Sequence, residues 1–496
     1  MESIWEMTTE IPGREQLSGG RNVQAAVIGG GLAGILTAYF LKQAGMDVLV
    51  IEGSRIGSGQ TGRTTAKITV SHGLIYENLI REMGLGKAQQ YAFANQEALR
   101  HYKRLIEEKK IDCDFEECTS YLYSVMEEKE IWEETRAAEK LGLGAKFTLQ
   151  TELPFQVRAA IAYKDQARFH PLKFLKAVSE ELDIVENTPV ERVEGGVIET
   201  KYGNVKAEHI IFASHFPFIN VPGFYFMRMH QERSYAAAFT GCPRMKDMYL
   251  GVDPCPGSHV GNYDGRALSF RGYGDYLLLG GYGHRTGENE AGGQYKRLEE
   301  AANSYWPGCR LKTAWSAQDC MTIDEVPYIG KYSAKTANWY VATGFRKWGM
   351  TSCMAAATVI TGMITGAGVP YAEVFSPQRF QLGTAVPEMF KEGVHSAKSL
   401  IAQNFSLPKE KVDEIPAGHG GVVQYQGEKV GVYKDESGEP HFVTTRCPHL
   451  GCQLTWNPQE LSWDCPCHGS RFDYRGNLLD NPAQEGICDE TISWEK

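Results

Sequence analysis

Four side chains near the end of the chain, Cys447, His449, Cys465 and His468, have the types and the spacing of metal ligands. They occur in the sequences C-P-H-L-G-C and C-P-C-H-G-S, which give the pattern C-x-H followed by C-x-x-H. Two thiolates and two imidazoles can ligate one kind of [2Fe–2S] cluster or a zinc ion. Zinc fingers usually begin C-x₂₋₄-C rather than C-x-H, so the spacing favours iron.

This segment resembles the Rieske family of [2Fe–2S] domains. The resemblance implies that the two thiolates bind one iron and the two imidazoles bind the other. It also implies a disulfide between Cys452 and Cys467, the extra cysteine in each half, for which a zinc site has no use. Short strands separated by turns surround the motifs, so we expect a small all-β domain over residues 413–496.

Two neighbouring residues bear on the reduction potential of the cluster. Ser470 stands where high-potential Rieske proteins have a serine that donates to a bridging sulfide, and Phe472 stands where they have a tyrosine that donates to a ligand cysteine. Reduction adds negative charge, which such donors stabilise. Because Phe472 cannot donate, we expect a potential below that of respiratory-chain Rieske proteins and above that of all-cysteine ferredoxins.

A second motif near the start of the chain predicts a dinucleotide site. A short apolar strand over residues 23–28 is followed by G-x-G-x-x-G at Gly29, Gly31 and Gly34, and the next predicted strand ends in Glu52. Glycines at these positions permit a tight turn, an approach of backbone to pyrophosphate, and close helix packing, while the carboxylate can accept ribose hydroxyls. The alternative is a glycine-rich turn in an unrelated α/β domain.

A small-residue loop over residues 57–66, containing Arg63, Thr64 and Thr65, follows the acidic strand end. With the later segments 324–330 and 340–345, it makes residues 22–365 resemble the D-amino-acid oxidase/glycine oxidase family. That resemblance implies FAD as the cofactor. Some relatives attach FAD covalently through a histidine of this loop, and because an arginine cannot do so we expect non-covalent FAD.

The resemblance also implies the architecture. We expect a discontinuous, Rossmann-like α/β FAD-binding domain, an interleaved antiparallel β-rich substrate domain, and the small all-β Rieske domain. The oxidoreductase spans residues 1–365, with nucleotide parts at about 22–80, 160–215 and 315–365 and substrate parts at about 81–159 and 216–314. Residues 366–412 are expected to connect it to the Rieske domain. A possible amphipathic helix at 386–405 belongs either to this connector or to the FAD domain proper.

Further cofactor contacts are expected from the segments that the family resemblance covers. A helix beginning near Gly349, Met350 and Thr351 would point its N-terminus at a flavin carbonyl and stabilise the anionic reduced ring. Val190 and Gly344 complete the candidate FAD-binding residues.

Candidate catalytic residues are Lys347, Arg63, His284 and Tyr235. Lys347 occupies the position of an arginine that clamps the substrate carboxylate in glycine oxidase-like proteins, but lysine lacks the bidentate fork. Arg63 is a candidate fixed positive charge beside the flavin. His284 and Tyr235 are candidates to line the substrate side. The alternative for each is a structural or surface role.

A flavin accepts two electrons as a hydride, whereas a [2Fe–2S] cluster accepts one electron at a time. The family resemblance makes the substrate an amine or amino acid, and a second electron carrier favours a dehydrogenase that passes electrons to a protein or a quinone. The competing hypothesis is a redox sensor or relay between protein partners.

Composition excludes several other classes. The chain has 496 residues and a net charge of −10, which argues against a nucleic-acid partner. The uncharged stretch over residues 25–41 is too short and too glycine-rich for a membrane anchor, and no secretory signal is recognised at the start. We therefore expect a cytoplasmic protein.

Overall fold

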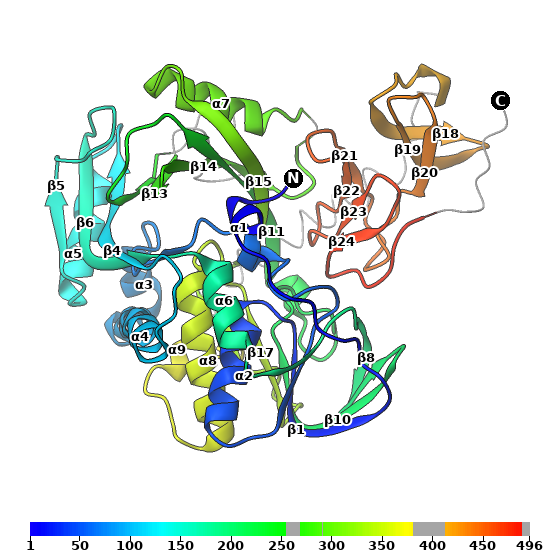
Figure 1. The fold of residues 1–496 in the computed structure, drawn as a ribbon, viewed down its shortest axis with the longest axis horizontal. Coiled ribbons are helices and arrows are strands. Elements are labelled where there is room, and N and C mark those ends of the chain that lie inside the picture. Colours follow the sequence, from blue (N-terminus) through cyan, green and yellow to red (C-terminus); the bar gives the residue numbers. More distant parts are fainter. Residues whose placement is uncertain (254–267, 290, 380–411, 489–496) are drawn as a thin grey trace.

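The structure is a computed structural model that describes residues 1–253, 268–289, 291–379 and 412–488. The possible helix at 386–405 lies outside these residues. Figure 1 shows two large sheets with helices packed around them and, at one side, residues 412–488, which we call the C-terminal β region. Within the described residues, every helix is too short or too polar to span a bilayer.

The first sheet is the nucleotide sheet. Its main path runs β16-β17-β10-β1-β2-β7, and β8 and β9 extend it beside β10. The strands β17, β10, β1, β2 and β7 run parallel to one another, as in other dinucleotide-binding folds, whereas β16 is antiparallel to β17. Their bounds are β1 Arg21–Ile28, β2 Val48–Ile51, β7 Asp183–Val185, β8 Val190–Glu194, β9 Val197–Thr200, β10 Gly203–Phe212, β16 Tyr328–Lys331 and β17 Trp339–Thr343.

Helices cover this sheet because its central strands are apolar on both faces. All four residues of β2 are buried, and so are the last four of β1. Helix α2 (Leu32–Gln43) follows β1 directly and packs against α8 (Gly349–Thr365), whose sequence is almost free of charge. The other helices are α1 Ile4–Thr8, α3 Tyr76–Met83, α4 Leu85–Lys109, α5 Lys129–Lys140, α6 Pro171–Ser179, α7 Gln294–Tyr305 and α9 Ala372–Phe375.

The second sheet is mostly antiparallel and runs β15-β11-β14-β13-β12-β4-β6-β3, with β5 beside β6. Its strands are β3 Lys67–Ile68, β4 Glu116–Ser124, β5 Ala145–Thr148, β6 Ala159–Arg168, β11 Met229–Thr240, β12 Met248–Gly251, β13 Ser269–Tyr273, β14 Tyr276–Arg285 and β15 Arg310–Thr322. It interleaves with the nucleotide sheet along the chain, as expected for the fold class.

The expected division of the chain differs from the strand pairing at three strands. We assigned about 22–80, 160–215 and 315–365 to the nucleotide part, but β3 pairs with β6, β6 with β4 and β15 with β11, all in the second sheet. The reason is that a strand belongs to the sheet of its hydrogen-bonded partners, and an apolar run in the sequence does not specify those partners.

The C-terminal β region contains two small antiparallel sheets, β18-β19-β20 and β21-β22-β23-β24. Their bounds are β18 Gly420–Tyr425, β19 Glu428–Lys434, β20 Pro440–Thr444, β21 Thr455–Asn457, β22 Ser462–Asp464, β23 Arg471–Asp473 and β24 Leu478–Asp480. In Figure 1 the second of these sheets faces the rest of the chain near β11 and β15.

A buried ion network joins the C-terminal β region to the second sheet. Arg233 of β11 is only 1% exposed and forms two hydrogen bonds with the carboxylate of Glu460, at 3.0 and 2.6 Å. Arg471 of β23 also reaches Glu460, at 3.0 Å, and pairs with Asp464 and Asp480. Burial opposes ionisation of Glu460, but the charges of Arg233 and Arg471 outweigh it and hold its pKa well below the usual range.

Arg233→Met is expected to destabilise the folded chain by about 3–5 kcal/mol, because it leaves the Glu460 carboxylate buried with one cation fewer. Denaturant unfolding followed by tryptophan fluorescence measures this. The matched control is Arg244→Met, which breaks an exposed pair with Asp275 and is expected to cost less than about 1 kcal/mol. Equal stabilities of the two variants would contradict the role of the network.

Candidate cofactor sites

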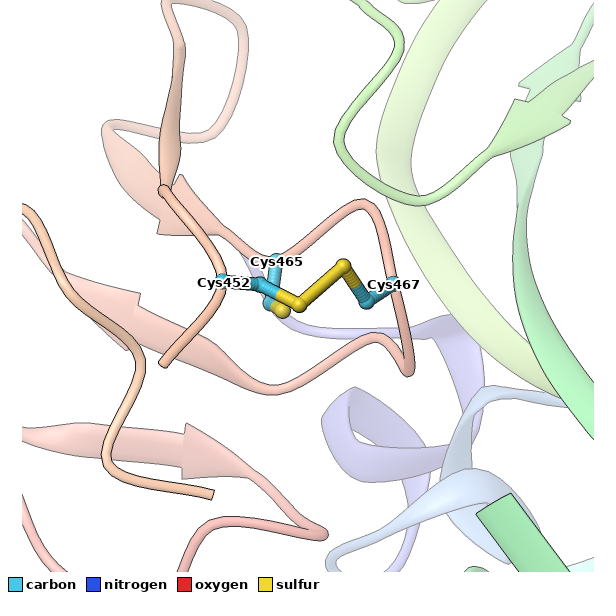
Figure 2. A group of neighbouring side chains, drawn as sticks. All are labelled: Cys452, Cys465 and Cys467. Carbon is cyan, nitrogen blue, oxygen red and sulfur yellow. A yellow bond between two sulfur atoms is a disulfide. The ribbon is translucent and has the colours of Figure 1, made fainter. Parts of the chain in front are cut away.

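The two cysteine–histidine loops of the C-terminal β region have matching turns. The Gly451 N–H donates to the Cys447 carbonyl and the Gly469 N–H donates to the Cys465 carbonyl, both at 2.9 Å. A disulfide between Cys452 and Cys467 links the loops, and the Cys465 sulfur lies within 4.8 Å of both disulfide sulfurs (Figure 2). The disulfide uses two of the four cysteines and leaves Cys447 and Cys465 as possible ligands.

The remaining donors fit a [2Fe–2S] cluster. The Nδ1 atom of His449 is buried and has no hydrogen-bond partner among the described residues, which leaves it available to bind a metal. The hydrogen bond with the Cys465 thiol, helped by the N–H groups of His449 and Leu450, lowers the pKa of Cys447 to about 7. His449 and His468 lie with ring centroids 4.9 Å apart. Two thiols and two imidazoles therefore converge, with thiolate favoured at Cys447.

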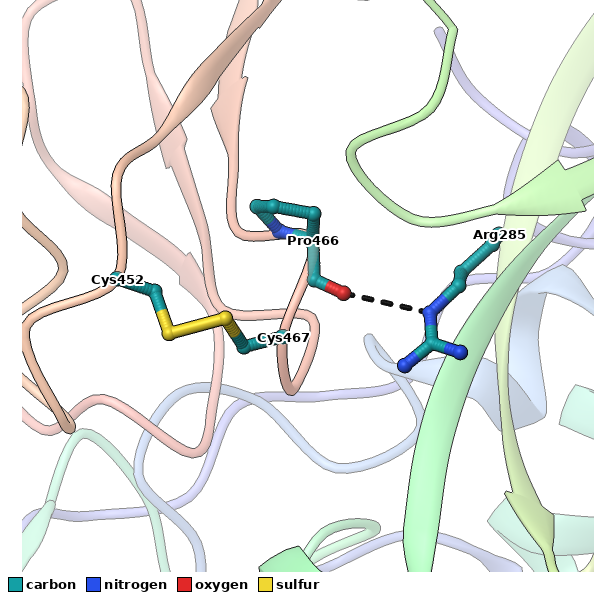
Figure 3. The surroundings of a disulfide bond; sticks show 4 residues. All are labelled: Arg285, Cys452, Pro466 and Cys467. Carbon is teal, nitrogen blue, oxygen red and sulfur yellow. Dashed lines mark hydrogen bonds between the residues drawn. A yellow bond between two sulfur atoms is a disulfide. The ribbon is translucent and has the colours of Figure 1, made fainter. Parts of the chain in front are cut away.

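Residues of the second sheet support the disulfide loop from outside. The Arg285 Nε–H donates to the carbonyl of Pro466, beside Cys467, at 3.3 Å (Figure 3).

Ser470, the residue expected to tune the cluster, accepts the N–H of Ala483 at 3.0 Å, and its side chain also contributes to the lowered pKa of Cys447. Phe472 is fully buried and pairs with Trp463 across β22 and β23.

Phe472→Tyr is expected to raise the midpoint potential of the cluster by roughly 60 mV. A hydrogen bond to a charged sulfur is worth about 1.5 kcal/mol, and tenfold in a one-electron equilibrium is 59 mV. An EPR-monitored redox titration of the loaded protein measures the shift, and Ser470→Ala, which removes a donor, is expected to lower the potential. An unchanged midpoint potential in Phe472→Tyr would contradict the prediction that a hydrogen-bond donor at residue 472 raises the potential of the cluster.

A cavity of about 840 Å³ lies at the carboxyl end of the nucleotide sheet. Its lining includes the loop between β1 and α2, where Gly29 has φ +114° and a Cβ at this residue would lie 2.5 Å from the Ala213 carbonyl oxygen. A Cβ at Gly34 would lie 1.9 Å from the Gly29 carbonyl oxygen, so this glycine serves helix–strand packing. The lining also includes Gly31 and Glu52.

Glu52 supports this loop as well as facing the cavity. Its carboxylate accepts the N–H groups of Gly30 at 2.6 Å and Ser54 at 2.8 Å. Burial raises the pKa of Glu52 despite these hydrogen bonds. The carboxylate is thus fixed at the edge of the cavity, where the sequence places a ribose partner.

The other expected FAD-binding residues divide into two groups. Those that line the cavity are Arg63, Thr64, Thr65, Val190, Gly349 and Met350. Gly344 and Thr351 are not among the lining residues. Gly344 (φ +72°) packs against Thr322, and the Thr351 hydroxyl lies 3.0 Å from Nε2 of His72. Both lie beside residues of the cavity wall, and a contact of either with FAD stays a prediction.

Helix α8 presents its N-terminus to the cavity. It begins at Gly349, and no side chain caps its first turn. Unpaired N–H groups and the helix dipole favour negative charge there. This geometry suits the anionic ring of a reduced flavin, as the sequence predicts.

Lys347, just before this helix, forms an ion pair that the sequence does not reveal. Its Nζ lies 3.2 Å from an Oε of Glu232 on β11. Burial opposes ionisation of Glu232, but the charge of Lys347 and a hydrogen bond with His230 hold the pKa of that carboxyl well below its usual range. Asp319 of β15, opposite Glu232, accepts the Ser234 hydroxyl at 2.7 Å. Burial raises the pKa of Asp319 to about 6.

Tyr235 and His284 contact each other. The Tyr235 hydroxyl lies 2.8 Å from Nε2 of His284, whose Nδ1 lies 2.7 Å from the Arg285 carbonyl. Burial lowers the pKa of His284, so the ring is neutral and accepts from the tyrosine. Tyr235 lines the cavity, whereas His284 is not among the lining residues, and the structure places it behind the tyrosine.

Asp319→Asn is expected to remove a pH-dependent part of the stability. A raised folded pKa means that this contribution is fully present below the unfolded pKa of about 3.9 and is lost as pH rises through about 6. Thermal unfolding of the FAD-loaded protein across this range measures it, with the exposed Asp275→Asn as control. If Asp319→Asn loses as much stability as the wild type over this range, the raised pKa is wrong.

The nucleotide sheet, the cavity at its edge and the cysteine–histidine loops define a flavin-dependent oxidoreductase that carries a [2Fe–2S] domain. The family model "FAD dependent oxidoreductase" (DAO) matches residues 24–363, and the "Rieske [2Fe-2S] domain" model matches residues 406–490. The chain therefore belongs to the DAO family of FAD-dependent oxidoreductases, with a C-terminal Rieske domain. FAD and a [2Fe–2S] cluster are its cofactors.

Relatives agree with both parts. A Bacillus subtilis (strain 168) protein, YhfW, described as a Rieske 2Fe-2S iron-sulfur protein, is 36% identical over 97% of this chain and 96% of its own length. Gamma-glutamylputrescine oxidoreductase of Escherichia coli (strain K12) is 24% identical over 38% of this chain and 47% of its own. The structure of L-proline dehydrogenase from P. horikoshii has a TM-score of 0.60 at 19% identity and covers 73% of this chain and 99% of that one.

Several residues that shape the site lie outside every motif. Glu232, Asp319, Gln231 and Gln318 are polar side chains in the middle of β11 and β15. The sequence does contain a pattern that could have revealed these residues. Strand β11 has an uninterrupted polar run from residue 230 to 235, although the fold largely buries this strand. Buried polar runs of this kind usually mark binding or contact surfaces.

Proposed function

We propose that this chain is a dehydrogenase that oxidises the C–H bond beside nitrogen in an amine or amino-acid-like substrate. FAD, when bound, would take the hydride, and the cluster would take the electrons singly toward a one-electron acceptor protein or a quinone. The imine product would hydrolyse. Arg63 in place of an attaching histidine supports non-covalent FAD.

The observation that carries this proposal is a hydrogen-bonded link between the cavity and a cluster loop. Gln318 is among the residues that line the cavity, and its side-chain Nε2 points to the cluster loop, where it donates to the Gly469 carbonyl at 2.7 Å and to Oε1 of Gln231 at 2.8 Å. Gln231 in turn donates to the His468 carbonyl at 2.7 Å. A protein that only bound FAD and a cluster would have no need to join the two sites so closely.

The end of the cavity formed by the second sheet supports a substrate site. Small residues of β11 and β14 line it, including Ala236, Gly280 and Gly281, and leave room beside Lys347 and Asp319. Because Glu232 already neutralises Lys347, this end is not a strong site for a carboxylate alone. A cationic or zwitterionic amine fits this balance of charge better than a simple carboxylic acid.

The names of similar proteins also indicate an amine or amino-acid-like substrate. They include a proline dehydrogenase, an L-amino acid deaminase from Proteus myxofaciens (TM-score 0.58, 15% identity) and an oxidoreductase of gamma-glutamylputrescine. Each name concerns a nitrogen-bearing compound.

Anaerobic mixing of the loaded protein with primary, secondary and N-methyl amines and amino acids is expected to bleach the flavin with at least one compound, followed by the EPR signal of a reduced cluster. Gln318→Leu is expected to leave bleaching unchanged and to slow cluster reduction several-fold, while the exposed-residue control Gln150→Leu changes neither. If a reductase partner bleaches the flavin and none of the amines does, the result would contradict the dehydrogenase proposal and favour a redox relay between protein partners.

A further inference from the structure

One loop of the FAD-binding part contacts both cofactor sites. After β10, the residues Ser214, His215 and Phe218 line the FAD cavity. Two further residues of the same loop, Asn220 and Phe226, meet the histidines of the cluster motif. The loop therefore runs from the flavin site to the expected cluster site within about a dozen residues.

Asn220 makes the closest of these contacts. Its Oδ1 lies 2.8 Å from Nε2 of His449, a residue 229 positions away in the sequence. A histidine that binds iron through Nδ1 carries its proton on Nε2 and must donate from there, so an amide oxygen is the matching partner. The Nδ1 atom of His449, buried and without a hydrogen-bond partner, is left for iron.

The position of Asn220 is itself fixed by the fold. Its backbone carbonyl accepts the Phe224 N–H at 2.7 Å, and the carbonyl of the preceding Ile219 accepts the Tyr332 hydroxyl. From the C-terminal β region, Asn481 donates to the carbonyls of Ser214 and Phe216 at 2.9 and 2.7 Å. The loop that carries Asn220 is therefore held by hydrogen bonds from the FAD-binding part and from the C-terminal β region.

Phe226 covers the same edge of the motif. Its ring lies edge-on to the imidazoles of His449 and His468, with centroid distances of 6.2 and 5.7 Å. His468 is only 6% exposed. His468 is thus turned away from solvent, and the partly exposed His449 is covered on one edge by Asn220 and Phe226.

We propose that Asn220 is a positioning residue for the cluster, and that the histidine edge of the cluster is an internal contact with the FAD-binding part rather than a docking site for an external quinone. Asn220 holds His449 in the tautomer that leaves Nδ1 for iron. The external acceptor then meets the C-terminal β region away from this edge.

This contact has a measurable effect on the cluster. An acceptor on Nε2–H makes the imidazole a stronger donor to iron and favours the oxidised cluster. A carboxylate at residue 220 does so more strongly and adds negative charge, whereas an apolar side chain does neither. The midpoint potential is therefore expected to be lowest in Asn220→Asp, intermediate in the wild type and highest in Asn220→Leu.

The experiment is an EPR-monitored titration of the FAD- and cluster-loaded chain with dithionite and mediators. Asn204→Asp, an exposed amide at the opposite end of β10, is the control and is expected to titrate like the wild type. Decylubiquinone added to the reduced wild type is expected to leave the g values of the cluster signal unchanged, whatever fraction of the cluster it oxidises. No amine is used, so this test stands even if the proposed substrate class fails.

Two results would overturn the inference. One is a fully loaded Asn220→Asp protein whose potential equals that of the wild type, because Asn220 would then not touch the ligand. The other is a shift of the g values of the wild-type cluster signal by decylubiquinone, because the histidine edge would then be open to an external quinone. Asn220→Asp is nearly isosteric with the wild type, and its EPR signal and FAD content report loading directly.

Discussion

The pairing of Arg233 with Glu460 is the interaction on which the arrangement of this protein depends. A guanidinium that is 1% exposed needs carboxylate partners, and the hydrogen-bonded carboxylate here comes from the C-terminal β region. Fork-like pairing fixes direction as well as distance. The C-terminal β region is thereby held in one orientation against β11. The hydrogen bonds of Gln231 and Gln318 with the cluster loops, and of Asn481 with the loop after β10, require that orientation.

Strand β11 serves two sites because successive side chains of a strand point to opposite faces. Gln231 and Arg233 lie on one face and meet the C-terminal β region. Glu232 and Ser234 lie on the other and meet Lys347 and Asp319 beside the FAD cavity. Neighbouring β15 repeats the pattern, since its register places Gln318 opposite Arg233 and Asp319 opposite Glu232. One pair of strands therefore separates the flavin site from the cluster loops by a single layer of backbone.

The cluster domain shows why its ligands and its fold are inseparable. Its apolar core is small and contains the ligand cysteines themselves, together with Trp463 and Phe472. A core of this size supplies little stability alone, so the disulfide and the cluster contribute to holding the loops. The larger part of the chain adds support from outside, through Arg285 at the disulfide loop and Asn220 at the ligand histidine. Electron transfer within one chain benefits from this rigidity, because neither partner has to diffuse to the other.

The sequence by itself determined the cofactors and the class of protein, because their motifs are local. C-x-H, C-x-x-H and G-x-G-x-x-G each place their functional atoms within a few residues, so spacing together with the family resemblance indicates the chemistry. Only the tertiary structure decided that β6 and β15 belong to the second sheet, that Lys347 pairs with Glu232, and that Asn220 meets His449. Those contacts join residues up to hundreds of positions apart. They exist because strand pairing and a buried ion network bring the segments together, and no short-range pattern encodes them.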